Sequence, residues 1–88
     1  MTYRVEFARP ARRALAEELP ETVAAAAWEL ITGPLCAKPC RIGKQLRAPF
    51  AGERVARRSS YRVRYRIDNH RQVLTIMDVR GRADIYLP

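Results

Sequence analysis

The feature that most constrains the fold of this chain is a strict two-residue alternation in YRVRYRID, residues 61–68. Tyrosine, valine and isoleucine occupy the odd positions, and arginine occupies positions 62, 64 and 66. Successive side chains of a β-strand point to opposite faces of the sheet, so this pattern predicts a strand with one apolar face and one row of guanidinium groups. Because like charges in a row repel one another, that second face needs either water or an anionic partner.

Positive charge is concentrated in the middle of the chain. The 88 residues contain 17 Lys and Arg against nine Asp and Glu, a net charge of +8. Residues 37–66 alone hold ten Lys or Arg and one acid, Glu53, so this segment carries +9 and the remainder sums to −1. A surface tuned only for solubility usually intersperses both signs. The segregation therefore favours one basic face, whose expected partner is nucleic acid or the ribosome.

The length and composition predict a single domain over residues 1–88. A hydrophobic fraction of 48% suits one small globular core. No apolar run approaches the ~20 residues needed to cross a bilayer. The N-terminal MTYRVEFARP also lacks the apolar region of a signal peptide. We therefore expect a cytoplasmic protein that does not contact a membrane.

The residues before the basic segment predict a strand and two helices. Residues 3–7 (YRVEF) alternate and predict a strand. Residues 9–20 (RPARRALAEELP) place apolar side chains at helical spacing, and their first proline suits the first turn. A second helix is predicted over residues 20–33 (PETVAAAAWELITG), and we expect Gly33 and Pro34 to end it.

The second half of the chain predicts a sheet. Residues 34–52 are rich in proline and glycine and predict a long, mostly extended connection. Strands are predicted at about 53–58, 61–67 and 72–79, and a short extended piece at 83–88. The order β-α-α-β-β-β predicts an α+β fold: a small antiparallel sheet of three to four strands with an N-terminal helical hairpin packed on one face. The arginines of the middle strand then lie on the open face.

Few residues fit metal-dependent or histidine-dependent chemistry. Cys36 and Cys40 are three residues apart, but zinc needs about four ligands and the single histidine, His70, lies in a predicted hairpin turn. We interpret both cysteines as structural or incidental and His70 as a solvated turn residue, and we expect no metal and no cofactor. Four acidic residues are interpreted as ion-pair partners of nearby basic residues: Glu53, Asp68, Asp78 and Asp84.

Arginine, lysine and tyrosine remain as candidates for chemistry. Arg80 and Arg82 stand at alternate positions, and Tyr86 follows them. Arginine matches phosphate oxygens bidentately and stays charged at any pH. A tyrosine crowded by arginines would have a lowered pKa, because positive charge favours the phenolate, and could accept a proton from a ribose 2′-hydroxyl. Spacing alone favours a plainer interpretation of Tyr86, as an aromatic side chain that packs near the C-terminus.

Three segments carry a resemblance to a known family. GERVARRSSYRVRYRID, VRGRADIYLP and GKQLR resemble the RelE branch of the RelE/ParE superfamily of toxins from toxin–antitoxin systems. The resemblance spans the whole chain in order. It implies a ribosome-dependent endoribonuclease that enters the A site, cleaves mRNA by metal-free attack of the 2′-hydroxyl and is neutralised by a RelB-like antitoxin. The implied partners are that antitoxin, the ribosome and mRNA, with operator DNA bound only through the antitoxin.

The resemblance also implies roles for individual residues. By position, Arg62 stabilises the transition state at the scissile phosphate, Arg80 contacts a second phosphate oxygen or the leaving group, and Tyr86 is the general base. Arg54 falls where the family has a basic residue at the start of the second strand, and it is the fourth candidate catalytic residue. Supporting RNA contacts are implied for Lys44, Arg47, Arg57, Arg58, Arg64, Arg66 and Arg82.

One position departs from the family pattern. Some members carry a second basic residue two positions after the one matched by Arg54, where this chain has Ala56. Arg57, one residue further, points to the opposite face of a regular strand. Arg64 and Arg66 are extra arginines, interpreted as a binding track for ribosomal RNA or antitoxin carboxylates. Two alternatives stay open: a ParE-like toxin that inhibits DNA gyrase and cleaves nothing, and a catalytically weak member that only occupies the ribosome or RNA.

Overall fold

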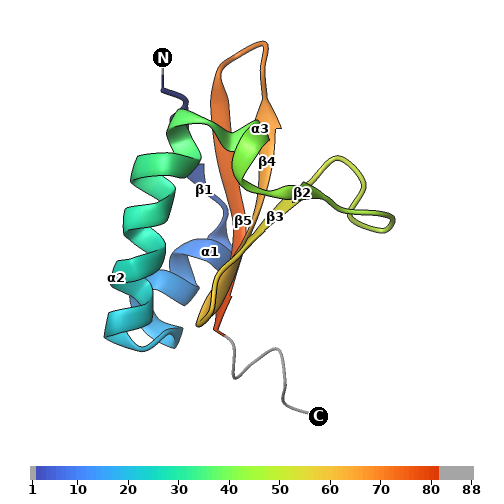
Figure 1. Cartoon of the computed structure of the whole chain (residues 1–88). Coiled ribbons are helices and arrows are strands. Elements are labelled where there is room, and N and C mark those ends of the chain that lie inside the picture. Colours follow the sequence, from blue (N-terminus) through green and yellow to red (C-terminus); the bar gives the residue numbers. More distant parts are fainter. Residues whose placement is uncertain (1, 82–88) are drawn as a thin grey trace.

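The structure of this chain, a computed structural model, describes residues 2–81 (Figure 1). None of its helices is long and apolar enough to span a membrane. Its elements, of which η1 and η2 are π-helical, are β1 (Arg4–Phe7), α1 (Arg9–Arg13), η1 (Ala14–Glu18), α2 (Glu21–Leu30), η2 (Ile31–Leu35), α3 (Pro39–Ile42), β2 (Lys44–Gln45), β3 (Arg54–Arg57), β4 (Tyr61–Asp68) and β5 (Val73–Gly81).

The five strands form one sheet in the order β1-β5-β4-β3-β2. The helices cover one face of this sheet, so the predicted α+β arrangement is confirmed (Figure 1). The sheet has one strand more than the predicted three to four, because residues 44–45 form the short strand β2. It is also mixed rather than antiparallel: β1 pairs with β5 in parallel. Parallel neighbours need a long crossover connection, and here the helices lie within the chain that links them.

The helix-covered face of the sheet holds the core. Val63 and Tyr65 of β4 are fully buried, and Tyr61 is nearly so, which confirms the predicted apolar face of this strand. The hydroxyl group of Tyr65 donates a hydrogen bond of 2.7 Å to the carbonyl oxygen of Pro39, and that of Tyr61 donates one of 3.2 Å to Ala26. The buried tyrosines therefore satisfy their polar ends on the overlying helical segments.

A bulge in β5 changes which of its residues face the helices. Arg64 lies opposite Asp78, but the next residue, Tyr65, lies opposite Ile76, so β5 has one extra residue at this point. Without it, Ile76 and Asp78 would point to the same face. With it, Ile76 is fully buried in the core while Asp78 lies on the open face, next to the arginines of β4.

The helix that begins with α2 does not end at Gly33 and Pro34, so that prediction is wrong. The chain continues through both residues as η2, and a further helical turn follows at α3. In an α-helix the proline ring would clash with the carbonyl group four residues earlier, and the wider π turn relieves this clash. Ile31 and Leu35 are fully buried, and this burial favours continuing the helix over the sheet. The predicted extended connection over residues 34–52 is therefore partly helical.

A candidate nucleic-acid site on the open face of the sheet

Three arginines from three neighbouring strands lie side by side on the open face. Arg57 of β3 is directly opposite Arg62 of β4, and Arg62 is directly opposite Arg80 of β5. Directly opposed residues have Cβ atoms about 5 Å apart and point to the same face. We call Arg57, Arg62 and Arg80 the arginine row. Their mutual repulsion is relieved by an anion, and the planar guanidinium group fits the oxygens of a phosphate.

A pocket of about 330 Å³ opens beside the arginine row. Arg62 and Arg80 form part of its wall, so two members of the row face the same space. The complete lining is Leu46, Phe50, Val55, Arg62, Arg64, Asp78 and Arg80. The pocket therefore combines cationic groups, one carboxylate and an apolar surface.

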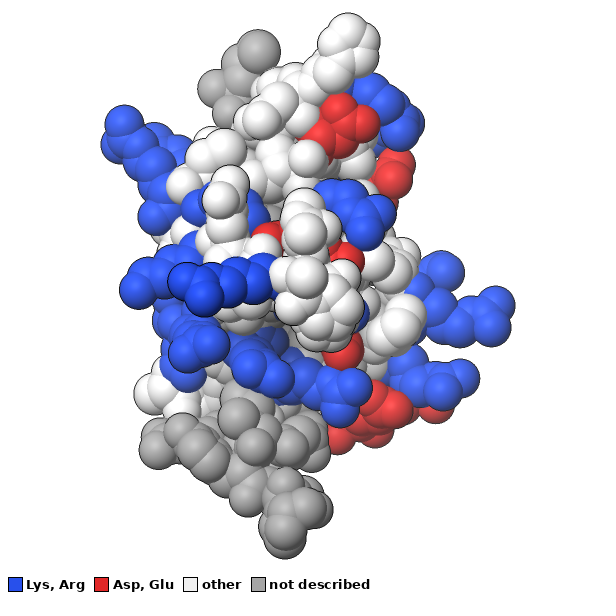
Figure 2. All heavy atoms as spheres, turned by 90° about the vertical axis from the view of Figure 1, so that its right-hand side faces the viewer, with Lys and Arg blue, Asp and Glu red and all other residues white. Residues whose placement is uncertain are grey.

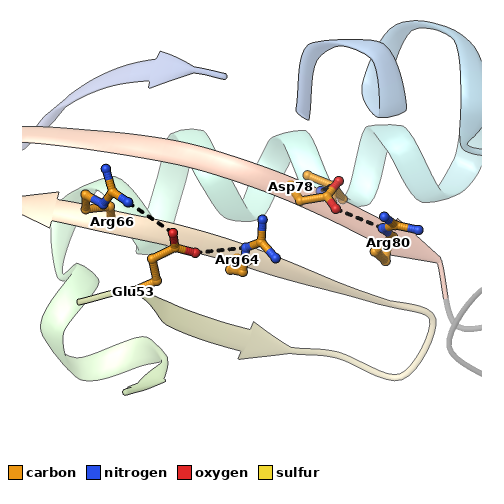
Figure 3. Close-up of polar contacts among 6 residues, drawn as sticks. Glu53, Arg64, Arg66, Asp78 and Arg80 are labelled. Atoms are coloured by element: carbon orange, nitrogen blue, oxygen red, sulfur yellow. Dashed lines mark hydrogen bonds and ion pairs between the residues drawn. The ribbon is translucent and has the colours of Figure 1, made fainter. Parts of the chain in front are cut away.

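Glu53 forms ion pairs with Arg64 and Arg66, the two arginines of β4 that are extra relative to the family pattern (Figure 3). Its Oε1 atom lies 2.9 Å from Nε of Arg64, without the alignment of a hydrogen bond, so charge attraction holds this pair. Its Oε2 atom accepts a hydrogen bond of 3.1 Å from Arg66. The Glu53 side chain is only 9% exposed, so this carboxylate is screened little by solvent. The proposed binding track at Arg64 and Arg66 is thus already paired with an internal anion.

Asp78 organises the other end of the pocket. Its Oδ2 atom lies 2.8 Å from Nε of Arg80 (Figure 3). Its Oδ1 atom accepts a hydrogen bond of 2.9 Å from the backbone N–H of Val79. The expectation that Glu53 and Asp78 form ion pairs is confirmed. Asp68 instead accepts a backbone hydrogen bond of 3.0 Å from Arg71 in the β4–β5 turn.

Arg54 lies on the helix-covered side of the sheet, away from the arginine row. It pairs in register with the buried Tyr65, and its guanidinium group donates hydrogen bonds to the carbonyl oxygens of Cys40 (2.9 Å) and Gly43. Arg54 therefore anchors the end of α3 to the sheet and does not join Arg62. Ala56 is fully buried on the same side, whereas Arg57 points to the open face, as its spacing from Arg54 predicts.

The remaining basic candidates surround this site. Figure 2 looks onto the side of the sheet opposite the helices and shows a band of Lys and Arg across it. Lys44 lies opposite Val55 in register and is exposed, and Arg47 is exposed in the loop after β2. Arg58 donates a hydrogen bond to the carbonyl oxygen of Arg57. Arg82, Asp84 and Tyr86, together with the predicted piece at 83–88, lie outside the described residues.

Burial in the core, and not the charge of nearby arginines, sets the direction in which the pKa of Tyr61 shifts. Burial raises the pKa of its phenol, which the positive charge of Arg58 opposes and the negative charge of Glu29 reinforces. Tyr61 is therefore not a proton acceptor near neutral pH.

Cys36 is buried and Cys40 exposed, and neither forms a disulfide. Within residues 2–81, no three His, Cys, Asp or Glu side chains cluster so that they could hold a metal.

Sequence reasoning missed the apolar part of the pocket. Leu46 and Phe50 come from the loop predicted to be an extended connection, and Val55 comes from β3. Phe50 was recognisable as a lone aromatic side chain within a polar, proline-containing stretch. Only the fold shows that the loop brings it over Arg64, whose guanidinium carbon lies 4.4 Å from the centre of the ring.

Comparison with known proteins connects this geometry to a family. Over residues 4–86 the chain matches the family described as ParE toxin of type II toxin–antitoxin system, parDE. It is 45% identical over 86 residues to Toxin RelG of Mycobacterium tuberculosis, covering 98% of both chains. The chain belongs to the RelE/ParE toxin family. This RelE/ParE toxin is also 40% identical to Toxin RelE of the same organism, covering 96% of this chain and 86% of that one.

Solved structures agree with this assignment. The toxin–antitoxin complex RelBE2 of M. tuberculosis contains a chain that matches with a TM-score of 0.88 at 41% identity, covering 93% of this chain and all of that one. The intact E. coli RelBE complex matches with a TM-score of 0.72 at 20% identity, covering 89% of this chain and 94% of that one, which shows a shared fold. The predicted family and fold class are therefore confirmed.

Proposed function

We propose that this toxin is a ribosome-dependent endoribonuclease that cleaves mRNA in the A site and is neutralised by a RelB-like antitoxin. The observation that carries this proposal is the arginine row, in which Arg57, Arg62 and Arg80 lie next to one another beside a pocket. Charge accumulates on the phosphoryl oxygens when a phosphodiester is attacked. Fixed cationic groups that face these oxygens lower the barrier, because they need no reorganisation during the reaction.

The proposed reaction is an in-line displacement. The 2′-hydroxyl oxygen loses its proton and attacks the adjacent phosphorus, and the 5′-oxygen of the next nucleotide leaves with a proton, which produces a 2′,3′-cyclic phosphate. Arg62 and Arg80 stabilise the phosphoryl oxygens, and Arg57 supplies the third cation in place of Arg54. Tyr86 remains the proposed general base on the strength of the family resemblance alone.

The antitoxin is the second part of the proposal. The relatives whose complexes are named RelBE2 and RelBE were solved as toxin–antitoxin complexes. Strands β2 to β5 present six cationic side chains on the open face, Lys44, Arg57, Arg62, Arg64, Arg66 and Arg80. Only two carboxylates among the described residues, Glu53 and Asp78, pair with them there. An antitoxin segment with acidic side chains complements this face and would cover the site.

The test is cleavage of mRNA on programmed ribosomes by the purified toxin. We expect a cut within the A-site codon, loss of cleavage when the antitoxin is added, and much weaker cleavage of free mRNA, because the ribosome supplies the positioning. Intact mRNA under all these conditions would contradict the proposed nuclease. Mapping the 5′ and 3′ ends identifies the bond that is broken.

The family description favours one alternative function. The matched family is described by its ParE members, and the family resemblance allows a toxin that acts on DNA gyrase. Inhibition of gyrase supercoiling, together with intact mRNA on the ribosome, would establish that function in place of the nuclease. Stalled ribosomes with uncut mRNA in a toeprinting assay would instead indicate a toxin that only occupies the A site.

A further inference from the structure

The pocket beside the arginine row has an apolar wall that phosphate binding does not use. Leu46, Phe50 and Val55 line it together with the charged groups of β4 and β5. Phe50 is one of the large hydrophobic side chains that the described part of the chain leaves exposed, with 42% of its surface accessible. Phosphate oxygens gain nothing from such a wall, so the pocket has features of a site for a ligand that is both anionic and aromatic.

Contacts of both the backbone and the ring restrict the motion of Phe50. The backbone N–H of Phe50 donates to Arg47 at 2.9 Å, and that of Glu53 donates to Phe50 at 3.0 Å. One face of the ring packs on the guanidinium group of Arg64 at 4.4 Å. Arg64 is itself fixed by Glu53. Glu53, Arg64 and Phe50 therefore form a supported stack at the edge of the pocket, which lowers the entropy cost of stacking a further ring.

We propose that this pocket binds a nucleobase of the single-stranded substrate, stacked against Phe50, while the phosphate attached to that nucleotide lies on the arginine row. The inference rests on the proposed RNA substrate and specifies how that substrate is held. Stacking on an aromatic side chain tolerates any base, since every base has a π face. Asp78 adds one acceptor in the pocket for a base N–H group, and Arg62 adds donors.

The charged residues that line the pocket favour a nucleotide as its occupant. A pocket that took an aliphatic side chain of the antitoxin would need only the apolar wall. Here the same cavity is also lined by Arg62 and Arg80, two members of the row that fits phosphate. A nucleotide satisfies both halves of the lining with one molecule, whereas an aliphatic side chain leaves the guanidinium groups unused.

Binding of two short strands with equal numbers of phosphates tests this proposal. One is a 2′-deoxy pentanucleotide, and the other is the same deoxyribose-phosphate backbone without bases. Neither has a 2′-hydroxyl, so binding is measured without turnover. For the wild-type toxin we expect the strand with bases to bind roughly 5- to 150-fold more tightly, the range that stacking of one base on an aromatic side chain supplies.

Substitutions locate this preference. Phe50→Ala should reduce the ratio of the two affinities to near one, and Phe50→Trp should preserve it. Arg57→Ala, which removes a phosphate contact, should weaken both strands by the same factor. Melting temperatures verify that each variant is folded. Equal binding of both wild-type strands, or a Phe50→Ala variant that keeps the full preference, would overturn the proposal.

The measurement does not involve the ribosome, so its outcome is separate from that of the proposed nuclease. A protein that prefers bases but cuts no mRNA would contradict the nuclease and leave the base pocket standing. A protein that cuts mRNA but binds both strands equally would contradict the base pocket and leave the nuclease standing.

Discussion

Arg62 and Arg80 lie directly opposite each other on β4 and β5, although like charges at opposed positions destabilise a sheet. Asp78 offsets part of this repulsion through its ion pair with Arg80. The bulge in β5 places Asp78 and Arg80 on the open face, because it shifts the alternation of that strand after Ile76. The arrangement favours an anion between the two arginines.

Arg62→Ala should lower the rate of mRNA cleavage on programmed ribosomes by about 100- to 1,000-fold, the usual effect of removing one fixed donor to a developing oxyanion. Arg66→Ala is the matched control, since Arg66 lies on the same strand and face but pairs with Glu53. We expect the control to change the rate less than about threefold, because Arg66 does not line the pocket and its guanidinium group is engaged by Glu53. Similar losses of rate in both variants would mean that cleavage depends on the total positive charge of this face and not on Arg62 in particular.

Arg54→Ala should destabilise the fold more than it impairs chemistry. The change removes hydrogen bonds from the guanidinium group to the carbonyl oxygens of Cys40 and Gly43. The expected loss is about 1–3 kcal/mol in the free energy of unfolding, measured by urea denaturation. Arg57→Ala should show the opposite pattern, with near-normal stability and reduced cleavage. A fully stable but inactive Arg54→Ala protein would restore Arg54 to the catalytic group.

Gly43→Ala should destabilise the protein by about 1–3 kcal/mol, because overpacking forces the surroundings to shift. A Cβ atom at Gly43 would meet the hydroxyl oxygen of Tyr65 and lie 2.6 Å from the carbonyl oxygen of Val55. Gly33→Ala is the control, since a Cβ atom there meets nothing within 4 Å. Within its helical segment, this second change should be neutral or stabilising by up to about 1 kcal/mol. Equal melting temperatures for the two variants would contradict the close packing at Gly43.

Glu53→Gln should strengthen binding of single-stranded nucleic acid and steepen its dependence on salt. The substitution releases Arg64 and Arg66 from their shared carboxylate. Each additional phosphate that these arginines neutralise adds about 0.7 to the magnitude of the slope of log K against log salt concentration. The variant should also lose about 1–2 kcal/mol of stability, because a nearly buried charged partner is removed. An unchanged salt slope would show that neither arginine reaches the strand once released.

The stability of the toxin should fall in strongly alkaline solution, partly through Tyr61. Burial raises the pKa of this phenol above its ordinary value of 10.0, so the folded state favours the protonated form. This contribution is fully present below the ordinary pKa and is lost as the pH rises through the raised pKa of the folded state. Melting temperatures measured between about pH 9 and 11 should drop less steeply for Tyr61→Phe than for the wild type. Parallel curves for the two proteins would contradict the assignment.

Local patterns predicted much of the fold. The alternation in residues 61–68 correctly placed tyrosine and valine in the core and arginine on the open face. The predicted helix end at Gly33 and Pro34 was wrong, because burial of Ile31 and Leu35 outweighed this local stop signal. The parallel pairing of β1 with β5 also escaped prediction, since it joins distant segments and leaves no short-range signal.

The candidate site was only partly predictable, because spacing along one strand does not give neighbours across strands. The proximity of Arg57, Arg62 and Arg80 depends on the registers of two strand pairs and on a bulge. The strand parity that separated Arg54 from Arg57 was readable from the sequence, but which of the two faced the helices was not. Similarly, the sequence suggested an ion-pair role for Glu53 without identifying Arg64 and Arg66 as its partners.

The pairing of β1 with β5 bears on how the toxin is synthesised. Arg4 pairs with Val73, so nearly the whole described chain separates the two strands. β5 lies between β1 and β4, and the nascent chain cannot complete its sheet until residues 73–81 have emerged. Contacts between such distant segments also form slowly. The pairing of Arg80 with Arg62, and with it the arginine row, therefore forms only after residues 73–81 have left the ribosome.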